Sequence, residues 1–142
     1  MKKIYLFSDG SALGNPGPGG YGTILRYNGT ERIISGGEPH TTNNRMELRG
    51  VIEGLKALKE PCEVIITSDS SYVVKAINEW LVNWVKRNFK KVKNPDLWQE
   101  YLEVSAPHKI TAIWVRGHDG HDENERCDDI ARGEAEQQKE NL

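Results

Sequence analysis

The chain has 142 residues, of which 37% are hydrophobic and 28% are charged, and its formal net charge is −2. These values suit one domain with a proper core, and we expect a single domain over residues 1–142. No apolar run is long enough to span a membrane, so we expect a cytoplasmic protein with no membrane partner. Two cysteines, Cys62 and Cys127, cannot form a disulfide framework and are expected to be buried thiols.

The first third of the chain has the pattern of three strands. Residues 4–7 are a short apolar run rich in β-formers, which predicts a buried central strand that ends at Asp9. Residues 11–20 are dense with turn residues and predict a loop. A turn at residues 28–29 (Asn-Gly) joins the next two strands, so that the three strands form an antiparallel meander. These two strands are predicted over residues 21–27 and 32–35.

After residue 41 the pattern alternates between helices and strands. Pro61 and Pro107 end two of the predicted helices. The order β-β-β-α-β-α-α-β-α predicts an α/β fold with a five-stranded mixed sheet and helices on both faces. The predicted elements are a helix capped by Asn43 or Asn44 and running to about Lys59, a strand over 63–67, a helix over about 71–84, a short helix from Pro95, a strand over 110–115, and a helix from about Asn124 with a frayed tail over 137–142.

One acidic residue of the first predicted helix lies toward its apolar side. Glu47 shares this side with Val51 and Leu58, and a carboxylate that faces a core is costly unless a cation meets it there. A metal ion could supply that charge. Alternatively, Glu47 is an ordinary first-turn acid that is favoured by the helix dipole and turns its tip to water.

Three further acids occupy positions that favour convergence with Glu47. Asp9 and Asp69 each follow a predicted strand, and Asp128 lies on the packed flank of the last helix; functional residues gather at such strand ends. Four carboxylates in one place would repel one another unless a divalent cation joined them, and all-oxygen ligands favour Mg²⁺ or Mn²⁺ over zinc. The alternative is that the strand-end acids are only turn formers and caps.

Two other motifs do not support a site of their own. The glycine-rich stretch after Asp9 lacks the lysine of a phosphate-binding P-loop and is followed by a strand instead of a helix. His118 and His121 lie near Cys127, but their spacing matches no four-ligand zinc pattern. We therefore expect neither a nucleotide cradle nor a zinc centre.

Several stretches of the chain together resemble bacterial ribonuclease HI, a type 1 ribonuclease H. They are residues 7–11 (FSDGS), 14–17 (GNPG), 41–48 (TTNNRMEL), 68–70 (SDS), and 117–128 with its closing NERCD. They occur in the family's order and spacing and cover nearly the whole chain. The resemblance implies a ribonuclease H-like fold and an endonuclease that hydrolyses the RNA strand of RNA–DNA hybrids, leaving 5′-phosphate and 3′-hydroxyl ends.

The resemblance also implies roles for the acids and one histidine. Asp9, Glu47, Asp69 and Asp128 correspond to the four metal-binding carboxylates of the family, which hold two Mg²⁺ ions, with Mn²⁺ as a possible substitute. Asp9 would bridge the ions, Asp128 would help to hold the ion that activates water, and the other two would hold the ion beside the leaving oxygen. His118 corresponds to a histidine that assists proton transfer or product release.

Recognition of the hybrid requires groups that sense 2′-hydroxyls on one strand only. A 2′-hydroxyl both donates and accepts, so amide side chains suit it. Asn15, Asn43 and Asn44 supply such amides beside the acids, and the resemblance places them on the minor groove. Thr42 and Asn94 resemble the residues that hold a phosphate of the DNA strand.

A basic segment between Glu79 and Asp96, which contains no acid, resembles the family's substrate-binding protrusion. Its cations would neutralise backbone phosphates with little sequence preference, which makes binding depend on salt. Trp80 either faces the DNA strand or packs in the core, whereas Trp84 and Trp98 are assigned to the core. The cations are Lys86, Arg87, Lys90, Lys91 and Lys93.

The chain departs from the family pattern at two places. Ser71 stands where many relatives carry a glutamine that touches RNA, and the protrusion is a few residues shorter than in well-known relatives. Two other functions were weighed: a DNA-cutting transposase-like or exonuclease-like enzyme, which the asparagines and the protrusion argue against, and an inactive hybrid-binding module, which the intact acids argue against. We expect a monomer without an obligate protein partner.

Overall fold

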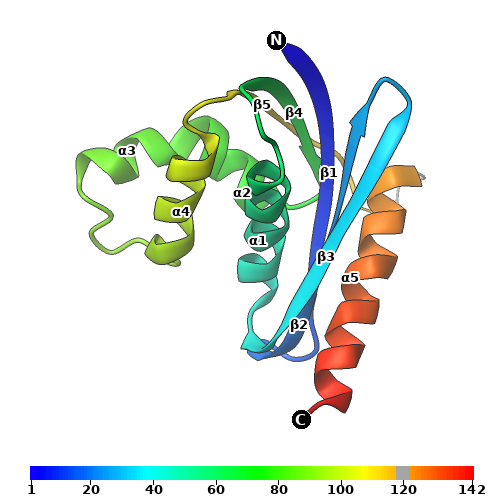
Figure 1. Ribbon diagram of the computed structural model, residues 1–142. Helices are drawn as coiled ribbons and strands as arrows, with labels where there is room; N and C mark the ends of the chain where they lie inside the picture. The colour runs from blue at the N-terminus through cyan, green and yellow to red at the C-terminus, as the bar shows by residue number, and fades with distance from the viewer. Residues whose placement is uncertain (118–121) are drawn as a thin grey trace.

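The computed structural model describes residues 1–117 and 122–142, and its centre is a five-stranded sheet of order β3-β2-β1-β4-β5 (Figure 1). The pairs β1–β2 and β2–β3 are antiparallel, and the pairs β1–β4 and β4–β5 are parallel. The predicted mixed sheet is therefore confirmed. The strands are β1 (Lys2–Ala12), β2 (Gly17–Tyr27), β3 (Thr30–Thr41), β4 (Cys62–Ser68) and β5 (Lys109–Trp114).

The helices cover both faces of the sheet, as predicted. One long helix, α5, lies across β1, β2 and β3 on one face, and the remaining helices lie on the other (Figure 1). None of the helices in the described part of the chain is both long and apolar enough to cross a bilayer. The helices are α1 (Asn43–Lys56), α2 (Ser71–Lys75), the π-helical turn η1 (Ala76–Trp80), α3 (Leu81–Lys86), α4 (Pro95–Ser105) and α5 (Asp122–Glu140).

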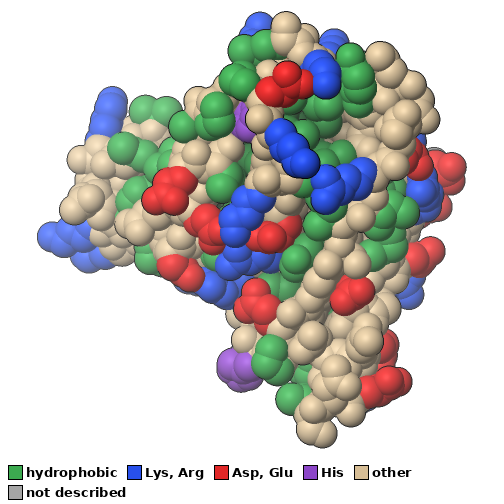
Figure 2. Space-filling model, in the orientation of Figure 1, with side chains coloured by type: hydrophobic (Ala, Val, Ile, Leu, Met, Phe, Trp, Pro, Cys, Tyr) green, Lys and Arg blue, Asp and Glu red, His purple; other side chains and the backbone are tan. Residues whose placement is uncertain are grey.

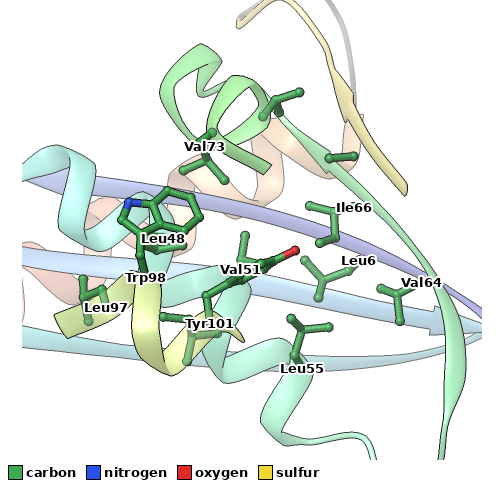
Figure 3. Close-up of a cluster of buried hydrophobic side chains, with 14 of the residues drawn as sticks. Leu6, Leu48, Val51, Leu55, Val64, Ile66, Val73, Leu97, Trp98 and Tyr101 are labelled. Carbon is green, nitrogen blue, oxygen red and sulfur yellow. The ribbon is translucent and has the colours of Figure 1, made fainter. Parts of the chain in front are cut away.

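Alternation along β1 divides the core between the two faces. Leu6 points into the larger cluster, where strand residues meet the apolar stripe of α1 and the fully buried indole of Trp98 (Figure 3). Phe7 points the other way and packs with Ile24 and the buried thiol of Cys127 beneath α5. Because a strand reverses its side chains at every residue, one short apolar run supplies both cores.

The first three strands are all longer than predicted. β1 continues past Asp9 through Ala12, and Ser11 and Ala12 pair with Gly20 and Gly19 of β2. Gly17, Gly19 and Gly20, which predicted a loop, thus belong to β2. At Gly20 α5 lies close above, since a Cβ there would stand 2.6 Å from the carbonyl oxygen of Ala131.

Helix boundaries also differ from the prediction. Thr42, and neither of the two asparagines, caps α1, since its hydroxyl oxygen accepts the backbone N–H of Arg45 at 3.2 Å. α1 ends at Lys56 rather than near Lys59, and α5 extends to Glu140, while fraying of residues 137–142 stays a prediction. The π-helical turn η1 contains one more residue per hydrogen-bonded turn than a regular α-helix. This shifts the side chains that follow, and Trp80, which the helical spacing places on the apolar stripe, is 37% exposed.

Candidate active site

Three carboxylates from distant parts of the chain meet at one edge of the sheet. Asp9 comes from β1, Glu47 from the start of α1, and Asp69 from the residue after β4; one oxygen of each lies within 4.8 Å of the others. Asp9 and Glu47 are buried, and Asp69 is partly exposed. The convergence that topology predicted is therefore found for these three acids.

A glycine allows this close approach. A Cβ on Gly10 would stand 2.2 Å from the backbone nitrogen of Glu47 and 2.3 Å from the carbonyl carbon of Met46, so β1 passes directly against the first turn of α1. The N–H of Gly10 also donates to Oδ1 of Asp9 at 2.9 Å. Gly117 approaches the third acid in the same way, since its Cβ would lie 3.0 Å from Oδ2 of Asp69.

The environment of these acids disfavours their charged forms. Burial, followed by the charges of Asp69 and Asp128, raises the pKa of Asp9 to about 7, although hydrogen bonds with Glu47 and the Gly10 N–H oppose the rise. Burial and the adjacent charge of Asp9 raise the pKa of Glu47 well above its ordinary range. Two acids that share one buried space cannot both ionise at low cost. A positive charge placed among these acids would therefore stabilise their ionised forms.

A divalent cation fits this set of donors. Oε2 of Glu47 is buried and has no hydrogen-bond partner among residues 1–117 and 122–142, so this oxygen is left without a donor or a cation. Carboxylate oxygens are the ligands that hard cations such as Mg²⁺ and Mn²⁺ prefer. An ion bound there would satisfy this oxygen and remove the repulsion at the same time.

The fourth predicted acid stands at the border of the cluster. Asp128 is not among the mutually close carboxylates, yet its charge contributes to the raised pKa of Asp9. Its Oδ2 forms an ion pair with Nε of Arg132, one turn further along α5, at 3.2 Å. The close approach of α5 to β2 at Gly22 holds this part of the helix beside the site. His118, and with it His121, lies outside the described residues.

A groove opens from the acids along the starts of α1 and α2. It has a volume of about 280 Å³ and is lined in part by Glu47, Asp69 and the predicted contacts Asn43, Asn44 and Ser71. The carboxamide oxygens of Asn15 and Asn43 are both engaged within the protein: the first accepts from the backbone N–H of Asn43, and the second from that of Ala12, each at 3.0 Å. Their NH₂ groups therefore remain to donate outward.

Arg45 joins the starts of α1 and α4, a role that the sequence reasoning missed. Its guanidinium donates to both carboxylate oxygens of Asp96, at 3.0 and 2.7 Å, and to Oδ1 of Asn94 at 3.2 Å. Asn94 in turn donates to the hydroxyl of Tyr72 at 3.1 Å. This network fixes Asn94 relative to Thr42, the helix cap. A cation in the first turn opposes the helix dipole, which is a signal that could have indicated a specific acidic partner.

The basic segment projects from the body of the protein with α3 and the turns that follow it (Figure 1). Lysine and arginine side chains gather at the end of this protrusion (Figure 2). Phe89 packs against the larger core cluster and anchors the segment, while the five predicted cations are all exposed. They are Lys86, Arg87, Lys90, Lys91 and Lys93.

A chain of aromatic rings connects the protrusion with the core. Trp98 is fully buried and lies 5.6 Å from Trp84, which lies 5.9 Å from Trp80, all between ring centroids. The core assignment is confirmed for Trp98, and Trp84 is partly buried against the same cluster. Trp80 contacts the ring of Trp84 and still exposes 37% of its surface, so it is not a core residue, and its contact with the DNA strand stays a prediction.

A mixed sheet that gathers carboxylates at the ends of neighbouring strands is suited to metal-assisted phosphoryl transfer, because paired divalent ions can clamp an in-line displacement.

Comparison with known proteins identifies the family. The RNase H family model matches residues 1–136. Ribonuclease H of Sulfurovum sp. (strain NBC37-1) is 69% identical over 99% of this chain and 96% of its own length. Ribonuclease HI of Helicobacter pylori (strain ATCC 700392 / 26695) is 62% identical over 96% and 95%.

A solved structure agrees with these relatives. The crystal structure of LC9-RNase H1 superposes with a TM-score of 0.89 at 35% identity, covering 97% of this chain and 74% of that one. The chain belongs to the ribonuclease H family, and the resemblance to bacterial ribonuclease HI is confirmed. Members of this family are metal-dependent endoribonucleases that hydrolyse the RNA strand of RNA–DNA hybrids.

Proposed function

We propose that this chain cuts the RNA strand of RNA–DNA hybrids with two Mg²⁺ ions, or Mn²⁺ in their place, and leaves 5′-phosphate and 3′-hydroxyl ends. The observation that carries the proposal is the meeting of Asp9, Glu47 and Asp69, with a buried carboxylate oxygen of Glu47 left without a partner. Family membership supplies the reaction, and these residues supply the place where it occurs.

The four acids would divide the ligand positions between them. Asp9, in the centre, would contact both ions; Glu47 and Asp69 would hold the ion beside the leaving oxygen, and Asp128 the ion on the side of the attacking water. Bound ions supply an activated water and charge stabilisation for the leaving oxygen. Arg132 would keep the Asp128 carboxylate oriented through its contact with Oδ2.

Metal binding and catalysis at this site would also involve the transfer of protons. Because burial raises the pKa of Asp9 to about 7, this residue would release a proton when it takes up a cation near neutral pH. His118, which lies outside the described residues, is proposed to assist proton transfer or product release. This role comes from the family resemblance alone.

Hydrogen-bond donors would select the hybrid. The outward NH₂ groups of Asn15 and Asn43 can donate to 2′-hydroxyl or base oxygens in the minor groove, with Asn44 beside them. Ser71 would take the RNA contact made by glutamine in many relatives, and its hydroxyl can both donate and accept. These groups favour RNA on the strand nearest the acids.

The second strand would be held further from the acids. Thr42 uses its hydroxyl oxygen as the acceptor in the helix cap, so its proton remains free for a DNA phosphate, beside the fixed amide of Asn94. Lys86, Arg87, Lys90 and Lys91 would neutralise further phosphates, and the exposed part of Trp80 would lie against the DNA strand. Such contacts give affinity without sequence preference.

The remaining parts of the proposal concern the state of the protein. We take residues 1–142 as one domain that acts as a monomer in the cytoplasm and needs no obligate protein partner. The family model covers residues 1–136, which supports the single-domain description. Sedimentation of the free protein and of its complex with a hybrid tests the monomer.

The test is cleavage of three duplexes of one sequence, RNA–DNA, RNA–RNA and DNA–DNA, with and without Mg²⁺. We expect metal-dependent cleavage of the RNA strand of the hybrid only. Equal cutting of duplex DNA would instead identify a DNA-cutting enzyme, and no cutting would identify a binding module. In parallel, Asp9→Asn should bind the hybrid nearly as well as the unaltered protein but should not cut it; undiminished turnover in this variant would refute the assignment.

A further inference from the structure

A second cavity lies beside the catalytic groove, between the helix formed by α2 and η1 and the edge strand β5. It has a volume of about 460 Å³, within the usual range for small-molecule pockets. Val74, Ala112 and Trp114 form its apolar walls. The small side chain of Ala112 leaves the space open, and Asn78 bridges the two elements by donating to the carbonyl oxygen of Ala112 at 3.1 Å.

The indole of Trp114 gives this cavity a fixed aromatic wall. Its Nε1 donates to the carbonyl oxygen of Asp69 at 3.1 Å, which ties the ring to the backbone of a catalytic acid. The residue is nevertheless 49% exposed. An aromatic ring that is both held in place and open to solvent is a suitable surface for stacking a planar group.

The polar groups of the cavity favour a neutral ligand over a phosphate. Lys75 and Glu79 both line the cavity and balance each other in charge. The NH₂ group of Asn78 is engaged with Ala112, which leaves its carboxamide oxygen as an acceptor, and the hydroxyl of Ser71 can donate or accept. Groups of this kind match the edge of a nucleobase.

The cavity adjoins the groove in which cleavage is proposed. Ser71 lines both this cavity and the groove that contains Glu47 and Asp69. A strand that lies in the groove against the acids can therefore reach the cavity past Ser71. A base inside a duplex is already stacked and paired, so only an unpaired base can offer its face to Trp114.

We propose that the cavity between α2–η1 and β5 binds an unpaired base of the RNA strand, stacked on Trp114, where that strand leaves the hybrid. The inference rests on the proposed function, because the occupant belongs to the same RNA strand that is cut. Hybrids with a single-stranded RNA extension on one side of the duplex are then bound more tightly than blunt hybrids of the same duplex.

The test compares KM for three kinds of hybrid: blunt, with a short RNA extension at the 5′ or the 3′ end, and with the same extension made abasic. We expect an extension at one end to lower KM by about tenfold, a value within the range for one base stacked on an aromatic side chain. The abasic extension keeps its phosphates and should lose this advantage. Equal KM values for all three substrates would overturn the proposal.

Ala112→Phe fills the cavity, and Ile113→Phe is its matched control. Ile113 is the next residue of β5, is 45% exposed and points to the opposite face of the sheet. The ratio of KM for blunt and extended hybrids should fall to about one in Ala112→Phe and should stay unchanged in Ile113→Phe. An extension that keeps its full advantage in Ala112→Phe would overturn the proposal.

A measurement on the unaltered protein covers the case in which Ala112→Phe does not fold. In metal-free buffer, a short oligoadenylate should shift the indole N–H signal of Trp114 in an NMR titration. Shifts confined to other residues would overturn the inference. The same preparation should also be assayed for cleavage of blunt hybrids. If it cuts them at the full rate but the cavity binds no base, only the inference fails. If it cuts no hybrid, the proposed function fails.

Discussion

The carboxylate cluster should destabilise the metal-free protein, so that Asp9→Asn is expected to increase stability while it abolishes cleavage. Burial and the neighbouring acids raise the pKa of Asp9 from 3.8 to about 7, and this difference corresponds to about 4 kcal/mol of unfavourable free energy in the charged form. An asparagine of the same shape carries no charge and can still accept the N–H of Gly10. We therefore expect the free energy of unfolding to rise by about 4 kcal/mol at pH 8.

The sign of the effect gives it a distinctive pH dependence. An acid with a raised pKa in the folded state binds more protons there than in the unfolded state, so the folded protein loses stability as pH rises from about 4 to about 7. The advantage of Asp9→Asn should be full above pH 7 and absent below the ordinary pKa of 3.8. Divalent ions should stabilise the unaltered protein and have a smaller effect on the variant.

Denaturant unfolding in metal-free buffer at pH 8 and pH 4 measures both effects. The control is Asp129→Asn, since the side chain of Asp129 is 73% exposed on α5; it should change stability by less than about 1 kcal/mol at either pH. An Asp9→Asn variant that is no more stable than the unaltered protein at pH 8, or whose gain persists at pH 4, would refute the electrostatic reasoning.

Three further predictions concern the backbone, the protrusion and the metal. Gly10→Ala should destabilise the protein by about 3 kcal/mol or more in thermal unfolding, because its Cβ would collide with backbone atoms of α1, whereas Gly133→Ala, with open space around it, should stabilise by about 0.5–1 kcal/mol. Replacing Lys90 and Lys91 by glutamine should raise KM more than it lowers kcat and should flatten the salt dependence of log KM by about 1.8; an unchanged slope would argue against the protrusion. The Mg²⁺ concentration for half-maximal cleavage should increase by up to about tenfold per pH unit below pH 7, because the ion must displace the proton of Asp9; a titration that gives equal values at pH 6 and pH 8 would contradict this.

The sequence predicted the architecture because hydrophobic periodicity determines which face each element buries. The apolar run at residues 4–7 became the central strand, and the turn at Asn28 and Gly29 joins β2 and β3, with positive φ at both residues. Three of the four acids also converged as predicted, since strand order alone brings the ends of β1 and β4 together.

What the sequence did not predict are features that depend on contacts between elements. Glycines in β2 are typical of turns when only neighbours in the chain are considered, yet Gly20 lies within a strand, where α5 covers it. The cap of α1 is Thr42 because its hydroxyl lies within hydrogen-bond reach of the Arg45 N–H. Capping propensity alone favours threonine and asparagine alike, so it could not decide between Thr42 and the two asparagines that follow it. The exposure of Trp80 follows from a π-helical turn, which hydrophobic spacing does not indicate.

The close approach of β1 to α1 accounts for both the glycine at position 10 and the clustering of the acids. The oxygens of Asp9, Glu47 and Asp69 lie within 4.8 Å of one another, and Gly10 allows β1 to pass directly against the first turn of α1, which carries Glu47. The same approach excludes water from Glu47, which raises its pKa and leaves an oxygen without a partner. A bound cation would convert this unfavourable arrangement into a favourable one. Substitutions that relieve the charge should therefore gain stability and lose catalysis, whereas substitutions at Gly10 should lose both.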